Sequence, residues 1–274
     1  STRWHRQCFF SDVDNDGDVD LWVGTVTNMM NASYTNFPLW TEEGWSSTGI
    51  ANGTTIFLND GQGNFTDTGS STGFHPFNMM SGSQADWNND GWIDIVGGPG
   101  GPRLGAVNPL LFYVNNQQGG FELKSPITNP HLWAKTHGMG WGDYNHDGSL
   151  DLIVNMSGIT PADAFKAQLW ENTGNENNWL IVQLRADGEN TNRHAVGARV
   201  TLTAGGVTQT RELWSGDALL NVRSKLHFGL GQAESIDRMV IRWPNAEHQE
   251  TVLEDVPLNK AIIVNESGIV EEIY

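Results

Sequence analysis

Three stretches of the chain repeat a pattern of oxygen-bearing side chains that is suited to holding a hard cation. Each has Asp or Asn at positions 1, 3, 5 and 9, glycine at position 6 and an aliphatic residue at position 8. The stretches cover 12–20, 86–94 and 143–151 and are called loops 1, 2 and 3. Alternate side chains of a tight loop can point at one centre, and glycine lets the chain turn sharply. Calcium takes six to eight oxygen ligands in flexible geometry, whereas magnesium demands a stricter octahedron, so the pattern predicts about three calcium ions.

The predicted ligands are the side chains at positions 1, 3, 5 and 9, with the backbone carbonyl at position 7. Loop 1 offers four carboxylates and the other two loops offer three, so charge count predicts the tightest site at loop 1. Crowded carboxylates repel each other unless a cation neutralises them. The alternative is that these are ordinary Asp- and Gly-rich surface turns. The predicted residues are Asp12, Asp14, Asp16, Asp20 and the carbonyl of Asp18; Asp86, Asn88, Asp90, Asp94 and that of Trp92; and Asp143, Asn145, Asp147, Asp151 and that of Ser149.

The segments that leave the loops predict strands on both sides of each one. An EF-hand loop would end with a bidentate Glu at position 12, between helices. Here position 12 is Val23, Gly97 or Val154, and short β-rich runs follow the loops. The loops are therefore expected to join one strand to the next.

Other elements repeat together with the loops. Residues 56–65 and 111–121 each predict a strand, a glycine-rich hairpin turn and a second strand, and 168–174 is a weaker third copy. Each repeat thus holds about four short strands in roughly 60 residues, as in the blades of a β-propeller. The first repeat carries an insertion at 28–54 with Trp40 and Trp45, which is expected to be a functional loop on one propeller face.

The pattern changes after Gly174. Alternating and β-branched residues predict a compact antiparallel β-domain of about 95 residues. Its expected strands cover 178–184, 192–202, 208–214, 226–231, 236–244, 251–253 and 261–264.

Both parts of the chain resemble known families. The loop pattern, with Leu-Phe-x-Asn-x-x-x-Gly-x-Phe, is similar to the FG-GAP/VCBS repeats of integrin-α-like propellers, whose loops bind calcium. The later part resembles the ASPIC/UnbV domain of cartilage-acidic-protein-like proteins, through segments such as 178–180, 197–200 and 227–231 and the Trp243-Pro244 pair. That family usually has a glycine soon after Trp-Pro, where this chain has Asn245 and Ala246. The resemblance implies an extracellular protein and carries no agreed chemistry.

The sequence therefore predicts an all-β chain, with propeller blades over 1–175 and a small antiparallel β-domain over 176–274. Propellers close with about four to eight blades, and an open three-blade stack would leave unpaired strand edges. The three repeats are expected to belong to a larger propeller, completed by an upstream segment or a second chain. Closure by the C-terminal domain is the less favoured alternative.

Composition limits the class of partner. The net charge of -17 argues against nucleic acid and anionic membranes, and three calcium ions would bring it only to roughly -11. No run of 18 apolar residues could span a membrane. The one cysteine, Cys8, follows the pattern of a buried small apolar residue. Because millimolar calcium exists outside cells, we expect a secreted or extracellular protein, with the cell surface or periplasm as alternatives.

No catalytic motif is present. The chain has no G-x-S-x-G, H-E-x-x-H or phosphate loop, and its histidines, such as His146 and His227, are scattered and expected to be structural. We expect a non-catalytic role in binding, adhesion or scaffolding, with an extracellular protein or polysaccharide as partner. The alternative is a carbohydrate-active enzyme, a lyase or hydrolase, which would need a deep pocket with two or more converging titratable groups.

Overall fold

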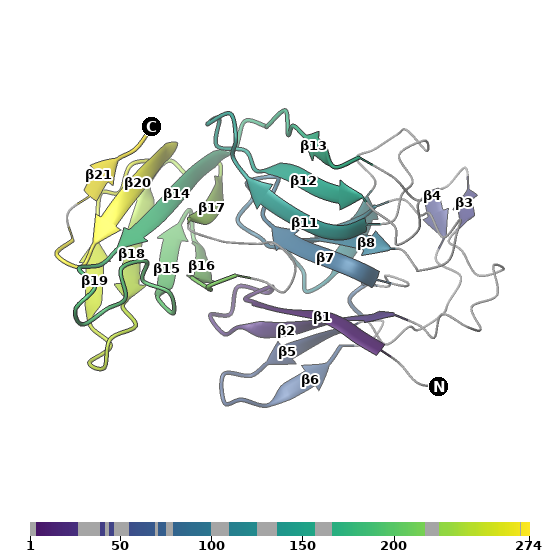
Figure 1. The fold of residues 1–274 in the computed structure, drawn as a ribbon, viewed down its shortest axis with the longest axis horizontal. Coiled ribbons are helices and arrows are strands. Elements are labelled where there is room, and N and C mark those ends of the chain that lie inside the picture. The colour runs from purple at the N-terminus through teal and green to yellow at the C-terminus, as the bar shows by residue number, and fades with distance from the viewer. Residues whose placement is uncertain are drawn as a thin grey trace.

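The computed structural model describes residues 4–26, 39–41, 44–46, 55–68, 71–74, 79–99, 110–124, 136–156, 166–216, 225–268 and 270–274. Every regular element in these ranges is a β-strand, which confirms the predicted all-β class. No helix in them is long and apolar enough to cross a membrane. Figure 1 shows three stacked sheets in purple, blue and teal, with a green and yellow β-sandwich at one end.

The three sheets are antiparallel meanders built around the predicted loops. We call these sheets blades 1, 2 and 3 in chain order. Each loop joins the first strand of the blade with the same number to the second strand, as the sequence predicted. A separate hairpin of β3 (Leu39–Thr41) and β4 (Gly44–Ser46) lies within the predicted insertion, whose remaining residues and tryptophan side chains lie outside the description. Blade 1 contains β1 (Trp4–Ser11), β2 (Asp20–Val26), β5 (Thr55–Asn59) and β6 (Phe65–Asp67); blade 2 contains β7 (Met79–Ala85), β8 (Asp94–Pro99), β9 (Leu111–Asn115) and β10 (Phe121–Lys124); and blade 3 contains β11 (Thr136–Gly142), β12 (Asp151–Met156) and β13 (Gln168–Trp170).

Consecutive blades pack through equivalent positions. We call the side of a blade that faces the next blade in sequence its forward face. Strand register makes Trp22 of blade 1 and Val96 of blade 2 equivalent, and both are buried against the following blade. The Trp22 ring also lies over Gly82, where an added Cβ would be only 2.5 Å from the ring. This close approach is why glycine is needed in β7.

In blades 2 and 3 an asparagine ties the sheet to its own loop and to the preceding blade. Asn115 donates its Nδ2 to Ile93 O (3.2 Å) in its own blade and to Val13 O (2.7 Å) in blade 1. In blade 3, Asn172 likewise bonds Leu150 O (3.3 Å) and Trp87 O (2.8 Å) of blade 2. Because unsatisfied buried carbonyls are costly, these bonds select the order and spacing of the blades.

The C-terminal segment forms two packed four-stranded sheets, in the orders β17-β14-β20-β21 and β16-β15-β18-β19. Their shared core includes Leu202, Phe228 and Trp243, which are fully buried. The strands are β14 (Asn178–Arg185), β15 (Arg199–Ala204), β16 (Val207–Glu212), β17 (Leu226–Gly231), β18 (Ile236–Arg242), β19 (Glu250–Leu253), β20 (Lys260–Asn265) and β21 (Val270–Glu272).

Three predictions for this segment and the first strand were wrong. The domain is not purely antiparallel, because β14 and β20 pair in parallel, and parallel neighbours cannot be told from antiparallel ones by alternation alone. The strand expected at 192–202 begins only at Arg199, since 192–198 form turns with Ala195 at φ 50°. Cys8 is exposed, because β1 turns Gln7 and Phe9 toward the core and Cys8 to the opposite face.

Removing the asparagine clamps provides a test of the packing between blades. We expect Asn115→Ala and Asn172→Ala each to lower the free energy of unfolding by about 1 kcal/mol more than Asn59→Ala, because each loses an additional bond between blades. Asn59 is the matched control, since it bonds the equivalent Val19 O of its own blade (3.1 Å). Urea denaturation of the three variants measures the difference. Equal losses would contradict a clamping role.

Candidate metal centre

Each loop folds around the carboxylate at its first position. Asp86 accepts the N–H of Asp90 (3.0 Å) on Oδ1 and that of Gly91 (2.8 Å) on Oδ2. Asp143 makes the same two bonds in loop 3, and in loop 1 Asp12 accepts the N–H of Gly17 (3.2 Å). The glycine at position 6 has a positive φ of 84–98° in all three loops, the conformation for which the sequence reasoning required it.

The aspartate at position 9 joins the loop to the sheet. Asp20 accepts the N–H of Val13 on Oδ2 and that of Asn59 on Oδ1, both at 2.9 Å. The equivalent oxygens of Asp151 accept the N–H groups of Tyr144 (3.0 Å) and Asn172 (2.8 Å), and Asp94 Oδ1 accepts that of Asn115 (2.8 Å). These bonds place a carboxylate beneath each loop.

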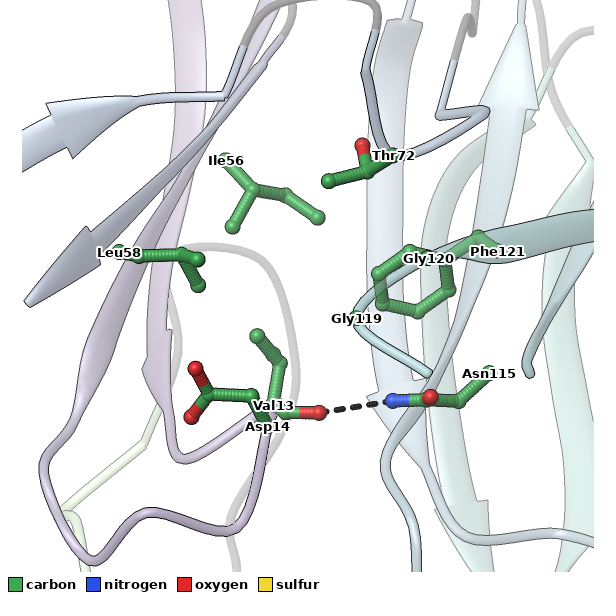
Figure 2. A pocket seen from close by; sticks show the side chains of 9 residues that line it. All are labelled: Val13, Asp14, Ile56, Leu58, Thr72, Asn115, Gly119, Gly120 and Phe121. Carbon is green, nitrogen blue, oxygen red and sulfur yellow. Dashed lines mark hydrogen bonds between the residues drawn. The ribbon is translucent and has the colours of Figure 1, made fainter. Parts of the chain in front are cut away.

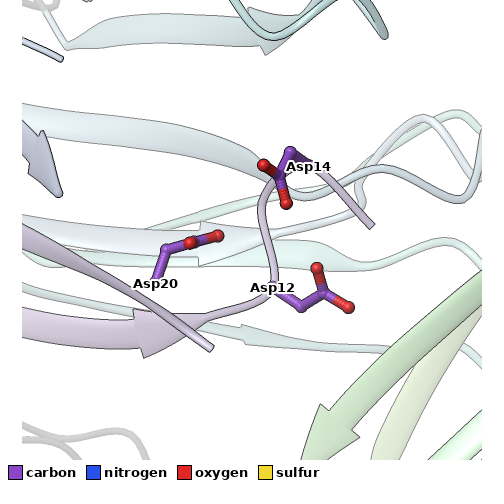
Figure 3. Close-up of side chains that lie close together, drawn as sticks. All are labelled: Asp12, Asp14 and Asp20. Atoms are coloured by element: carbon purple, nitrogen blue, oxygen red, sulfur yellow. The ribbon is translucent and has the colours of Figure 1, made fainter. Parts of the chain in front are cut away.

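In loop 1 three of the predicted ligands converge. Asp12 and Asp14 from the loop and Asp20 from the start of β2 each bring a carboxylate oxygen within 4.8 Å of the others (Figure 3). Asp12 and Asp20 are buried, each with 1% of its surface exposed. All candidate donors are hard oxygen atoms, which suit calcium.

The side chains at positions 3 and 5 form hydrogen bonds within their own loop. Asp16, Asp90 and Asp147 each accept the N–H of position 7 on Oδ1, at 2.8–2.9 Å. In loops 2 and 3 the asparagine at position 3 donates its Nδ2 to the position-5 carboxylate, at 3.0 and 2.8 Å. Thus Asn88 and Asn145 offer the neutral oxygen that the sequence predicted, while their amide nitrogen orients the neighbouring carboxylate.

One buried carboxylate oxygen of loop 1 lacks a hydrogen-bond partner. Asp12 Oδ1 is shielded from solvent and accepts no hydrogen bond. An unpaired buried charge is expensive unless a cation or donor offsets it. The donor set and this oxygen therefore fit a resident cation at loop 1.

Burial opposes ionisation of the same groups. Desolvation raises the pKa of Asp12 to about 6 and that of Asp20 to about 7, with neighbouring aspartates adding to both shifts. In loop 2, burial raises the pKa of Asp86 to about 7 and that of Asp94 well above its usual value, with Asp90 contributing to both. A bound cation would reverse these shifts by favouring the ionised form.

The C-terminal sandwich touches all three loops, which the sequence analysis did not predict. Burial raises the pKa of Asp12 and Asp86, and the positive charge of the buried Arg211 of β16 nearby offsets part of this rise. The Tyr274 hydroxyl hydrogen-bonds Asp143. Burial is the larger cause and the negative charge of this carboxylate the smaller cause that together raise the pKa of Tyr274 to about 12. No spacing in the sequence links these residues to the loops, because they lie far apart in the chain.

Two histidines lie at loop 3. His146, at position 4 of the loop, is exposed, and the centroid of its ring lies 4.0 Å from that of Tyr274. His227 is part of β17, and its Nε2 hydrogen-bonds Gly148 O at 3.1 Å.

A small cavity lies at the seam between blades 1 and 2. Figure 2 shows Ile56 and Leu58 on one side and Phe121 on the other, with the Asn115 bond to Val13 O below them. The cavity measures about 10 Å³, the size of a single water molecule. Its only titratable lining residue is Asp14, so this cavity offers no pair of converging acid and base groups.

Comparisons with known proteins agree with this architecture. The model of the FG-GAP-like repeat matches residues 86–154, from the start of loop 2 into β12, and the ASPIC and UnbV model matches residues 188–270. The chain combines an FG-GAP-like repeat with an ASPIC/UnbV domain. Loop 1 lies outside the matched residues, but its strand register and the hydrogen bonds made by its residues at positions 2, 6 and 9 match those of loop 3.

Other comparisons contribute less. One similar solved structure is a candidate cell adhesion protein from Bacteroides uniformis, with 13% identity, a TM-score of 0.22 and coverage of 62% of this chain and 84% of that chain. A likeness at this TM-score supports no conclusion about fold or function. No curated protein matches the chain.

The raised carboxyl pKa values predict how stability depends on pH without metal. The folded pKa values of Asp12, Asp20 and Asp86 lie above the usual value of about 3.9, so the folded state binds more protons than the unfolded chain between about pH 4 and 7. The stabilisation that comes from protonating these carboxyl groups is therefore fully present below about pH 4. It is lost as the pH rises through the folded pKa values of about 6 to 7.

We expect the free energy of unfolding in EGTA to fall between pH 5 and 8, and to fall less in Asp20→Asn. Calcium should oppose this loss, because it binds the ionised carboxylates. Denaturant titrations at several pH values test this, with the exposed Asp60→Asn as control. A wild-type pH profile that Asp20→Asn leaves unchanged would contradict the assignment.

Proposed function

We propose that the chain is a calcium-stabilised propeller segment, in which each of the three loops holds one calcium ion. The observation that carries this proposal is the convergence of Asp12, Asp14 and Asp20, with a buried Asp12 oxygen that accepts no hydrogen bond. Backbone hydrogen bonds to the aspartates at positions 1 and 9 recur in loops 2 and 3, and they support the proposal for those loops. The ion would supply charge neutralisation and cross-link the loop to its sheet.

We further propose a non-catalytic role in binding, adhesion or scaffolding outside the cell, at the cell surface or in the periplasm. Loops of modest affinity would be filled at extracellular calcium concentrations. The net charge of -17 favours a protein or polysaccharide over nucleic acid. The enzyme alternative requires converging titratable groups in a deep pocket, and no observation in the described residues favours it.

A further blade is the partner that the open side of blade 3 supports best. On the forward faces of blades 1 and 2, three equivalent positions pack on the next blade. In blade 3 these positions are Tyr144, Ile153 and Leu169, with 51%, 53% and 53% of their surfaces exposed. At the opposite end of the stack, Phe65 is 43% exposed, whereas its equivalent Phe121 is buried against blade 1. The equivalent positions are Val13, Trp22 and Ile56 in blade 1 and Trp87, Val96 and Phe112 in blade 2.

The exposed face of blade 3 thus corresponds to the forward faces of blades 1 and 2. The exposed face of blade 1 corresponds to the face of blade 2 that packs on blade 1. An upstream segment or a second chain could supply the additional blade. Large exposed apolar clusters of this kind mark interaction sites.

The calcium sites are tested by replacing one ligand. Asp16→Ala should remove one carboxylate from loop 1 and so lower the calcium stoichiometry or weaken one of three sites, with a lower melting temperature in calcium. Asp18→Ala is the matched control, because position 7 is expected to contribute only its backbone carbonyl. Calorimetric titration and thermal unfolding in calcium or EGTA measure both effects. Unchanged stoichiometry, affinity and melting temperature in Asp16→Ala would rule out the loop 1 site.

The open face of blade 3 is tested by adding a charge to it. Ile153→Asp should weaken any association between blades, because it places a carboxylate where Trp22 and Val96 are buried in the other blades. Val252→Asp, which changes an apolar side chain 45% exposed on the sandwich, is the control. Sedimentation of the calcium-loaded chain over a range of concentrations measures association. Self-association that Ile153→Asp leaves intact would contradict the assignment of this face.

A further inference from the structure

We propose that the ASPIC/UnbV domain is part of the loop 2 calcium site, with the Gly229 N–H as a positioning group for Asp86. Calcium binding at loop 2 and docking of the domain would then strengthen each other. This inference rests on the proposed calcium function and assigns one of its sites to two domains.

Strand β17 lies directly against loop 2. The Gly229 N–H donates to Asp86 Oδ2 (3.1 Å), and the Gly231 N–H donates to Asn89 O (2.8 Å). A Cβ at Gly229 would lie 2.2 Å from Asp86 Oδ2 and 2.4 Å from the Asn89 backbone. Only glycine permits this approach, so β17 is shaped to fit the loop.

The Gly229 bond acts on a predicted first-position ligand. Asp86 Oδ2 already accepts the Gly91 N–H, and the Gly229 N–H is a second donor to the same atom. Donors to a carboxylate favour its ionised form and hold its orientation, as outer-shell groups do around bound metals. With the domain docked, Asp86 is only 1% exposed, so an ion in the loop would also be shielded from solvent on this side.

The linker before β14 completes the frame around loop 2. Asn175 and Asn177 both donate their side-chain Nδ2 to Asn88 O, the second of these bonds at 2.9 Å. Asn88 is the predicted position-3 ligand, so these bonds fix the loop backbone at a second ligand position.

The other two loops meet the domain differently. In loop 3, Trp179 covers Gly148, where a Cβ would lie 1.8 Å from the ring, and the Tyr274 hydroxyl bonds Asp143. In loop 1, the domain brings the buried guanidinium of Arg211 near Asp12. Among the described contacts, only in loop 2 does the residue at position 1 accept a backbone N–H from the domain. We therefore expect calcium binding to depend most strongly on docking of the domain at loop 2.

Docking and ion binding are coupled because each offsets a cost of the other. Docking without the ion buries the carboxylates of Asp86 and Asp94 close to each other and to that of Asp90, so that their negative charges repel. If calcium binds while the ASPIC/UnbV domain is not docked, Asp86 lacks the hydrogen bond from the Gly229 N–H. Such coupling is reciprocal, and its usual size corresponds to an affinity change of roughly 5- to 150-fold.

The first test compares two glycine variants of the full chain by calcium titration. Gly229→Ala should weaken one of the three sites at least about 5-fold and leave the other two close to wild type. Gly268→Ala controls for destabilisation of the domain, because alanine is strained at its φ of 82° while a Cβ there would make only ordinary contacts, with Thr251 and Leu253. Three unchanged affinities in a folded Gly229→Ala variant would overturn the proposal.

The second test needs no variant. In hydrogen exchange on the wild-type chain, removing calcium with EGTA should speed exchange of the Gly229 and Gly231 amides, while amides paired between β15 and β18 stay protected. Equal protection of β17 with and without calcium would overturn the proposal. Failure of the wild-type chain to bind any calcium would refute the proposed function itself, which is a different result from both of these.

Discussion

Carboxylates held beneath a backbone loop are the constraint on which the rest of this structure depends. In blades 1 and 3 the position-9 aspartate begins the second strand and accepts one N–H of the loop and one at or just beyond the end of the third strand. It therefore sets where the loop, the second strand and the third strand meet. The same geometry desolvates negative charge, which a native state tolerates only with donors or a cation nearby.

The asparagine that follows the third strand extends this arrangement from one blade to the next. The N–H of Asn115 bonds the aspartate of its own blade, and its amide reaches the loop of the preceding blade. Loop conformation and blade order are thus coupled through adjacent atoms. An ion that stabilises a loop would for the same reason stabilise the contact between blades.

The ASPIC/UnbV domain uses the side of the loops that the blades leave open. Its strand β17 approaches loop 2 at a glycine, and Trp179, His227 and Tyr274 gather around loop 3. These contacts explain physically why the two domain types occur together in one chain. The domain covers the charged end of the blades, whereas the apolar forward face of blade 3 stays exposed.

Much of the fold and of the candidate site could be predicted from the sequence, because both depend on local spacing. The clustered oxygen-bearing side chains, the glycine at position 6 and the strands flanking each loop follow from patterns within about twelve residues. Long-range pairing could not be predicted in this way. The parallel β14–β20 pair, the exposure of Cys8 and the turn at 192–198 depend on which neighbour a strand meets.

The sequence by itself thus determined the three loops, their oxygen-bearing side chains and the all-β blades, since these are encoded by residues adjacent in the chain. Only the tertiary structure decided that Gly229, Arg211 and Tyr274 stand over those loops. These residues lie in strands or at a terminus without any motif, and their role comes from the close approach of two domains in space.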